Sequence, residues 1–159
     1  MKFVSVNESD KFAYRDSRIN KVNMADSGIT LEVEALIVRR DNSQNSNYTD
    51  SYAGDTNIIF RAANIDRIIK LGYKKYDAND HLLEEIDDEE VNMEAAGLSY
   101  LMTGAYLTGI SKSGDDSLTI GIEIPDEDPA AVTDEYEIVL KTDELRVEWD
   151  KYLNRVQEY

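Results

Sequence analysis

Alternation of apolar and polar positions marks several stretches of the chain as half-buried strands. In residues 29–38, ITLEVEALIV, the side chains of Leu31 and Val33 would share one face of a strand, and Thr30 and Glu32 the other. A period of two is that of a β-strand with one face on a core. The end of this run is apolar on both faces, so we expect it to be covered on both sides.

The same pattern, read with Gly, Asn, Asp and Pro as turn signals, predicts a mainly β chain. HLLEEI, after the turn-prone residues 78–80, is a candidate for a short partner strand. Consecutive hairpins with little helix between them favour an antiparallel sheet or sandwich, and leave open whether the strands form one sheet or two. About seven strands are predicted, at residues 18–24, 29–38, 57–61, 67–76, 104–111, 117–124 and 135–141.

The tail of the chain has a helical spacing of apolar residues. Leu145, Trp149, Tyr152 and Val156 would lie on one side of a helix over residues 143–157. We therefore predict a C-terminal amphipathic helix packed on the sheet. The rival interpretation makes LRVEW one more strand, and the pattern does not decide between the two.

A second helix is an option near residues 88–103. Val91, Leu98 and Met102 fall on one helical stripe, and the acids at residues 87–90 would stand at its N-terminus, where the helix dipole favours negative charge.

Length and composition fit one acidic, β-rich domain over residues 1–159. A chain of this size buries roughly 70% of its unfolded surface, so it needs no metal or disulfide to fold. It contains no cysteine, which excludes disulfides, thiol catalysis and thiolate zinc sites.

Charge is distributed unevenly. Residues 1–75 hold 12 Lys and Arg against 10 Asp and Glu, a balance of +2, whereas residues 76–159 hold 5 against 23, a balance of −18. This disfavours direct binding of nucleic acids and of anionic membranes, because both need a basic surface. It permits a basic protein partner, and it is equally compatible with a surface that is acidic only for solubility.

The strongest concentration of acids is at residues 77–94, which hold nine Asp and Glu and no Lys or Arg. We take four of them as candidate partner-binding residues: Glu84, Glu85, Asp87 and Asp88.

Motifs for catalysis, cofactors or metals are missing from the sequence. His81 is the only histidine, and a surface position among acids is its simplest interpretation. No phosphate-binding, dinucleotide-binding, zinc-protease or nucleophile-elbow motif occurs. We expect no cofactor and no metal, and favour a non-enzymatic role while leaving acid-pair catalysis open. The N-terminal apolar run is too short for a signal peptide, and no apolar segment is long enough to cross a membrane, so we expect a cytoplasmic chain.

Residues 41–56, DNSQNSNYTDSYAGDT, place sixteen polar, turn-prone residues between two apolar runs. Short polar side chains can bond to nearby backbone, so one interpretation is a self-capped connection pinned by its tyrosines. The other is a binding loop, because amides and hydroxyls beside aromatic rings suit a small polar ligand or a carbohydrate. The candidate ligand-binding residues are Asn45, Asn47, Tyr48, Asp50 and Tyr52.

The runs QNSNYTDSYAGDT, GYKKYDAND, GAYL and VEWDKYLNRVQ resemble a group of small, acidic, uncharacterised bacterial proteins. Some of these carry the label of a subtilin (lantibiotic) biosynthesis sensor. A sensor kinase needs a phosphoacceptor histidine in a helical hairpin and an ATP-binding domain, which the motifs of this chain do not supply. The resemblance therefore implies a family and assigns no residue roles.

Together these observations favour a cytoplasmic binding protein whose acidic C-terminal half meets a basic protein partner. The alternative is a domain that binds a small polar ligand or carbohydrate at residues 41–56. The oligomeric state is left open.

Overall fold

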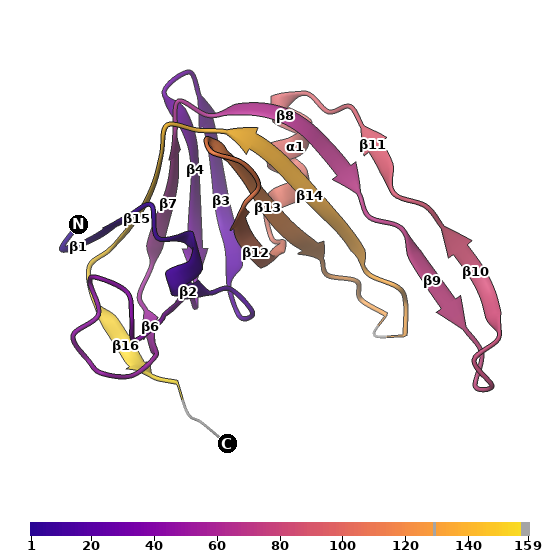
Figure 1. The fold of residues 1–159 in the computed structure, drawn as a ribbon, viewed down its shortest axis with the longest axis horizontal. Coiled ribbons are helices and arrows are strands. Elements are labelled where there is room, and N and C mark those ends of the chain that lie inside the picture. The colour runs from indigo at the N-terminus through magenta and orange to yellow at the C-terminus, as the bar shows by residue number, and fades with distance from the viewer. Residues whose placement is uncertain (129, 157–159) are drawn as a thin grey trace.

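The computed structural model describes residues 1–128 and 130–156, and their architecture is mainly antiparallel β. Ten strands form one sheet in the order β1-β15-β7-β4-β3-β12-β13-β14-β8-β11. A four-stranded sheet, β16-β6-β5-β2, and a two-stranded one, β10-β9, complete the described fold. Figure 1 shows the result as an arch, with β9 and β10 projecting from one end.

We call residues 1–61 and 142–156 the terminal lobe, because they contain both ends of the described chain. The large sheet contributes five strands to this lobe, and the four-stranded sheet packs beside them. Its elements are β1 (Phe3–Val6), the 3-10 helix η1 (Ser9–Lys11), β2 (Phe12–Ala13), β3 (Arg18–Ala25), β4 (Gly28–Glu34), β5 (Ile37–Val38), β6 (Ser51–Ala53), β7 (Thr56–Arg61), β15 (Glu144–Trp149) and β16 (Tyr152–Arg155).

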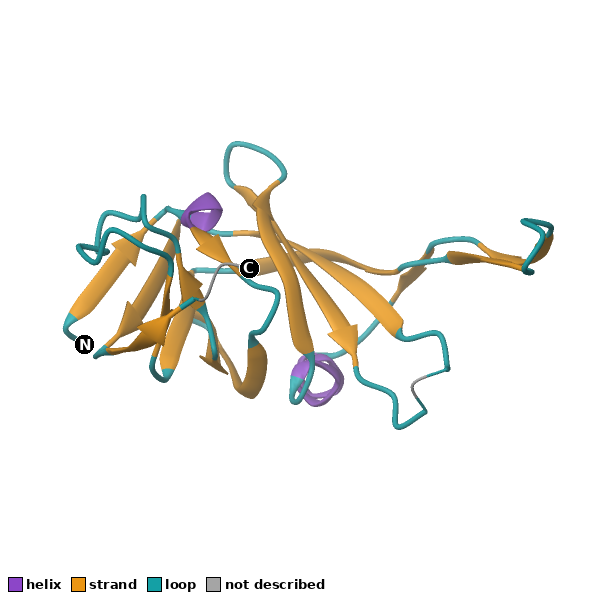
Figure 2. Ribbon diagram, turned by 90° about the horizontal axis from the view of Figure 1, so that it is seen from below, coloured by secondary structure: helices purple, strands orange, loops and turns teal. Residues whose placement is uncertain are grey.

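Residues 62–141 form the middle lobe, which carries helix α1 on one face of its strands (Figure 2). Its elements are β8 (Asn64–Lys70), β9 (Tyr73–Tyr76), β10 (Leu82–Ile86), β11 (Glu89–Val91), α1 (Ala95–Met102), β12 (Tyr106–Lys112), β13 (Ser117–Ile124) and β14 (Asp134–Lys141).

The two lobes meet where β3 passes β12. These strands share a single pair, Arg18 with Tyr106. Further backbone bonds join Ile19 to Ala105 and to Gly104, at 2.8 and 2.7 Å. Although the ladder is short here, one hydrophobic cluster continues through the contact and includes residues of both lobes. Burial of apolar surface, more than strand pairing, therefore holds the lobes together.

The predicted alternation is confirmed in the longest hairpins. Leu31 and Val33 of β4 are buried, and their neighbour Glu32 is exposed. In β13 the side chains of Ile120 and Ile122 are buried, and β13 pairs with β14 over eight residue pairs. The mainly antiparallel β class is thus confirmed, but the chain has sixteen strands over its described residues where about seven were predicted.

Two predicted strands are divided by the chain geometry. The stretch 29–38 breaks into β4 and β5 at Ala35, whose φ of +57° is incompatible with a continuous strand. The stretch 67–76 breaks into β8 and β9 at residues 71–72. Most of the other additional strands are two to four residues long, too short for a period to be visible in the sequence.

The predicted C-terminal helix over residues 143–157 is wrong for residues 144–149 and 152–155, which form β15 and β16; residue 157 lies outside the described residues. Leu145, Val147 and Trp149 are buried and alternate with less buried neighbours. Strand β15 fits between β1 and β7 and pairs with both. Because pairing on both sides satisfies the whole backbone, the period of two prevails over the helical spacing.

The optional helix near residues 88–103 is confirmed only for its second half. Helix α1 spans Ala95–Met102 and buries Leu98 and Met102. The acids at residues 87–90 do not cap it, because Glu89 and Glu90 belong to β11, which pairs with β8.

Candidate functional site

The β9–β10 hairpin, residues 73–86, is the most unusual element of the described structure, and we call it the arm. Its two strands pair only with each other. Every residue of β10 is exposed, as are the last three of β9. A lone two-stranded ribbon is marginally stable in water, so an arm that projects from the body depends on whatever stabilises its two ends.

The tip of the arm is closed by Asp77. One of its carboxylate oxygens accepts hydrogen bonds from the backbone N–H groups of Asn79 and His81, at 2.8 and 2.9 Å. The other lies 3.2 Å from the ring Nδ1 of His81. The bond from the His81 amide is the main reason that the pKa of Asp77 is lowered. His81 is thus an exposed part of a turn and has a local structural contact.

The base of the arm is held by a tightly packed joint. The backbone N–H of Gly72 donates to the carboxylate of Asp88 at 2.6 Å, and the N–H of Leu71 donates to the carbonyl of Glu135 at 2.8 Å. A side chain at Gly72 would place its Cβ 2.0 Å from the carbonyl oxygen of Ile86. The direction in which the arm leaves the body is therefore set by backbone contacts.

The four acids predicted to bind a partner lie on the arm and at its joint. Glu85 stands opposite Lys74, and their charged groups are 3.6 Å apart. Glu84 stands opposite Lys75. Glu84, Glu85, Asp87 and Asp88 are all exposed, but Asp88 is tied to the joint by its bond to Gly72.

Large apolar side chains accompany these acids on the arm, and the sequence analysis did not select them. Tyr76 faces Leu82 across the ribbon with half of each side chain exposed (52% and 50%). Leu83 is 61% and Ile86 45% exposed. Single exposed apolar residues are common, but four on one short ribbon mark a surface that could be covered by a partner. In the sequence, LLEEI shows no alternation, which is the one signal that could have indicated exposure on both faces.

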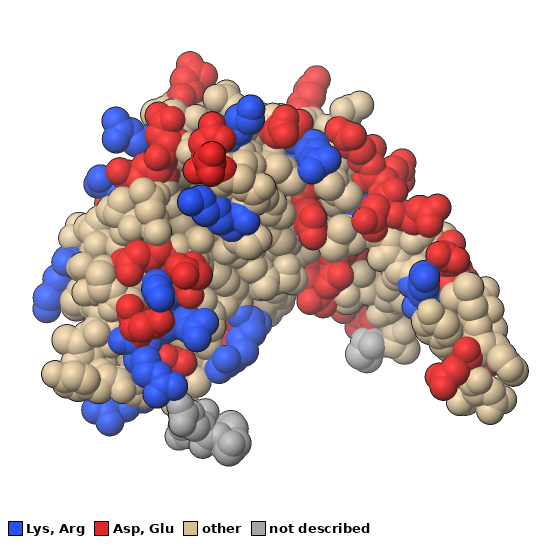
Figure 3. All heavy atoms as spheres, in the orientation of Figure 1, with Lys and Arg blue, Asp and Glu red and all other residues tan. Residues whose placement is uncertain are grey.

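Charge is also unevenly divided between the two lobes. The terminal lobe holds 11 Lys and Arg against 13 Asp and Glu, a balance of −2, and the middle lobe holds 6 against 19, a balance of −13. Figure 3 shows acids along the outer border of the arch above the arm, and basic side chains gathered on the lower part of the terminal lobe. The negative potential is therefore concentrated on the lobe that carries the arm.

The loop between β5 and β6 is tied into the protein by its own amides. The side-chain amide of Asn45 donates to the carbonyls of Val38, Arg39 and Thr49 at 3.0 to 3.1 Å. Buried Asn42 donates to the Ser5 hydroxyl at 3.3 Å. These bonds fit the interpretation of residues 41–56 as a self-capped connection. The last residues of this stretch form β6 and the start of β7.

The five candidate ligand-binding residues make separate local contacts. Asn47 donates to the Ser51 hydroxyl, and Asp50 accepts from the backbone of Arg40. Tyr48 is 92% exposed and adopts a left-handed backbone with φ +60°. Tyr52 donates to Asp16 at 2.6 Å, which is the main reason its pKa is raised. The side-chain amide of Asn45 already donates to the three backbone carbonyls named above.

Tyr52 borders an open cleft of about 580 Å³ together with Asp16, Asp55 and Lys151. This cleft is formed by β6 and the turn after it with the start of β16, so it brings together residues about 100 positions apart. A ligand-binding role for the loop remains a prediction.

Over residues 1–128 and 130–156, no three His, Cys, Asp or Glu side chains meet in a way that could hold a metal ion. No helix among the described residues is long and apolar enough to span a membrane.

Comparison of the chain with protein-family models, with curated proteins and with solved structures found no match in any of the three.

Proposed function

We propose that this protein is a non-enzymatic binding protein that binds a basic protein through its acidic middle lobe. The arm makes the main contact. The observation that carries this proposal is the arm: a projecting ribbon that exposes acids and large apolar side chains together. Acids alone would suit a solvated surface, whereas exposed leucines, isoleucine and tyrosine add no solubility.

The two kinds of side chain would contribute differently to binding. The balance of −13 on the middle lobe would steer a basic partner toward the arm and accelerate association at low salt. Burial of Tyr76, Leu82 and Leu83 would then supply the apolar contact that holds a complex together. The apolar residues and the acids Glu84 and Glu85 lie together on the arm, so a partner needs to cover only a small surface.

The test is a charge reversal with a matched control. In the variant E84K/E85K/D87K, three exposed acids of the arm and joint become lysines, and Asp88 is kept because it holds Gly72. The control D10K/D26K/D55K makes the same change in net charge on the terminal lobe, at exposed acids whose carboxylates have no hydrogen bond or ion pair within the described residues.

A partner recovered from native lysate on the immobilised wild-type protein, and eluted by salt, would be titrated against all three proteins. We expect the arm variant to bind at least about tenfold more weakly and the control to bind within about twofold of wild type, since rim charges near a contact act locally. Equal weakening of both variants would show a general effect of net charge and would contradict the proposal.

A further inference from the structure

We propose that the partner binds by strand addition: an extended segment rich in Lys or Arg pairs with the free edge formed by β10 and β11. This inference rests on the proposed function and specifies how the basic partner is recognised. We call residues 82–91 the outer edge.

The outer edge is open along both of its strands. Among the strands of residues 1–128 and 130–156, β10 ends the two-stranded sheet and pairs only with β9, and β11 ends the ten-stranded sheet and pairs only with β8. Because β8 and β9 follow one another along the chain, as do β10 and β11, the two free edges lie on the same side of the ribbon. Figure 1 shows them in succession along the outer border of the arch. A strand edge of this kind presents unpaired N–H and C=O groups that another strand can use.

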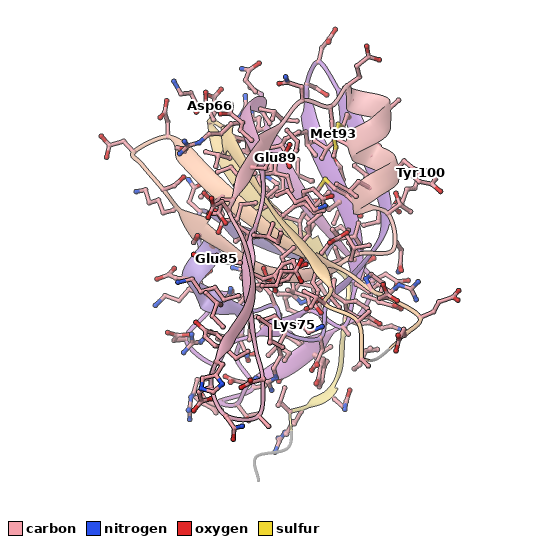
Figure 4. All side chains as sticks on the ribbon, turned by 90° about the vertical axis from the view of Figure 1, so that its right-hand side faces the viewer. Asp66, Lys75, Glu85, Glu89, Met93 and Tyr100 are labelled. Carbon is pink, nitrogen blue, oxygen red and sulfur yellow. The ribbon has the colours of Figure 1, made fainter. Side chains whose placement is uncertain are left out.

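The side chains along this edge indicate which strand would fit. Glu84 and Glu85 point to opposite faces of the ribbon, since they stand opposite Lys75 and Lys74, and Glu89 and Glu90 likewise follow one another in β11. Figure 4 shows Glu85 and Glu89 along the same border, seen from the side of the arm. Leu83 and Ile86 flank the first pair of acids. A complementary strand would therefore carry basic residues in adjacent pairs, separated by aliphatic ones.

The same charges argue against a second copy of this chain as the occupant. Pairing two outer edges would bring Glu84, Glu85, Glu89 and Glu90 of each copy close to those of the other, and like charges on neighbouring strands are destabilising. Acids on an edge also protect it from aggregation, but they do so selectively, because they repel acidic strands and attract basic ones. The edge thus favours a partner of opposite charge.

The probe is a synthetic peptide, acetyl-TVKKVKKVT-amide, whose sequence is the same in both directions and so fits either strand orientation. Its matched control has the same side chains but is N-methylated on two adjacent central residues, which blocks hydrogen bonding from both of its edges. Binding is measured by isothermal titration calorimetry at about 50 and 150 mM salt, between which screening of exposed charges increases. Amide hydrogen exchange of the wild-type protein locates the peptide.

We expect the N-methylated peptide to bind at least about tenfold more weakly than the probe, as main-chain hydrogen bonds supply the affinity in strand addition, and the probe to slow exchange within residues 82–91. Equal binding of the two peptides, with both lost in E84K/E85K/D87K, would overturn strand addition and leave the proposed function intact. Equal binding of the probe to that variant and to wild type would contradict both. If the protein without peptide forms a dimer in which amide exchange of residues 82–91 is slowed, the outer edge binds a second copy of the chain and the inference is overturned.

Discussion

Replacing Gly72 by alanine tests whether the joint orders the arm. A Cβ at this position would lie 2.0 Å from the carbonyl oxygen of Ile86 and 2.6 Å from the carbonyl carbon of Asp87, against 3.4 Å for an ordinary contact. The backbone at Gly72 and the backbone at Ile86 must move apart by about 1.4 Å, the difference between 3.4 and 2.0 Å. Both obstructing atoms belong to the backbone, so no side chain can rotate to relieve the clash.

The cost of this separation is about 1–3 kcal/mol by analogy with overpacked interiors. A lone hairpin has little stability to lose, so we expect the arm to open locally while the core remains folded. The free energy corresponds to amide exchange roughly 5- to 150-fold faster within residues 73–86, and exchange in β13 and β14 should be unchanged. The melting temperature should fall by less than the roughly 2–4 °C that 1 kcal/mol of global destabilisation produces in a chain of this size.

The matched control is G109A, because a Cβ at Gly109 would meet no atom within 4 Å. Exchange of the arm in G109A should equal that of wild type. If the arm of G72A exchanges no faster than that of wild type, the joint does not order the arm and the reasoning is refuted.

Three further changes follow from the fold. G97A should raise stability by about 1 kcal/mol, because Gly97 lies inside helix α1 with open space around it; a lower denaturant midpoint would contradict this. W149A should cost about 3–5 kcal/mol in urea unfolding, since Trp149 is fully buried and packs on Phe3 and Phe12; an unchanged free energy of unfolding would contradict this packing. Tyr14 is buried and donates to the Ser9 carbonyl, and burial raises its pKa. Its contribution to stability should hold below the unfolded pKa near 10 and be lost as pH rises beyond it, so Y14F should show a shallower alkaline fall in unfolding free energy; an identical fall would contradict the assignment.

The strands that could be predicted from sequence are those that bury one face against a neighbour close in the chain. Strands β3 and β4, or β12 and β13, are joined by turns of a few residues, so each strand packs beside a neighbour that is close in the sequence. Strand β15 is different, because its partners β1 and β7 lie more than 80 residues away. The sequence Leu145 to Trp149 fits either period, and only the gap between those strands selects one.

The candidate site was predictable in its charge and not in its shape. Acids at residues 77–94 are visible in the sequence, but an arm with both faces exposed has no burial pattern to detect. The loop shows the opposite case. Its residues are recognisably turn-prone, yet the partners of Asn42, which include Ser5 in β1, depend on long-range packing. For that reason the sequence could not tell a binding loop from a self-capped one.

The most direct measurement is the position at which the partner touches the protein. A photo-crosslinking phenylalanine analogue would replace Tyr76 on the arm or, in a separate protein, Tyr48 on the loop; both tyrosines are at least half exposed. We expect crosslinks to a basic protein from position 76, lost when E84K/E85K/D87K is added, and none from position 48. Crosslinks from position 48 alone would contradict the proposal and transfer the binding surface to the loop.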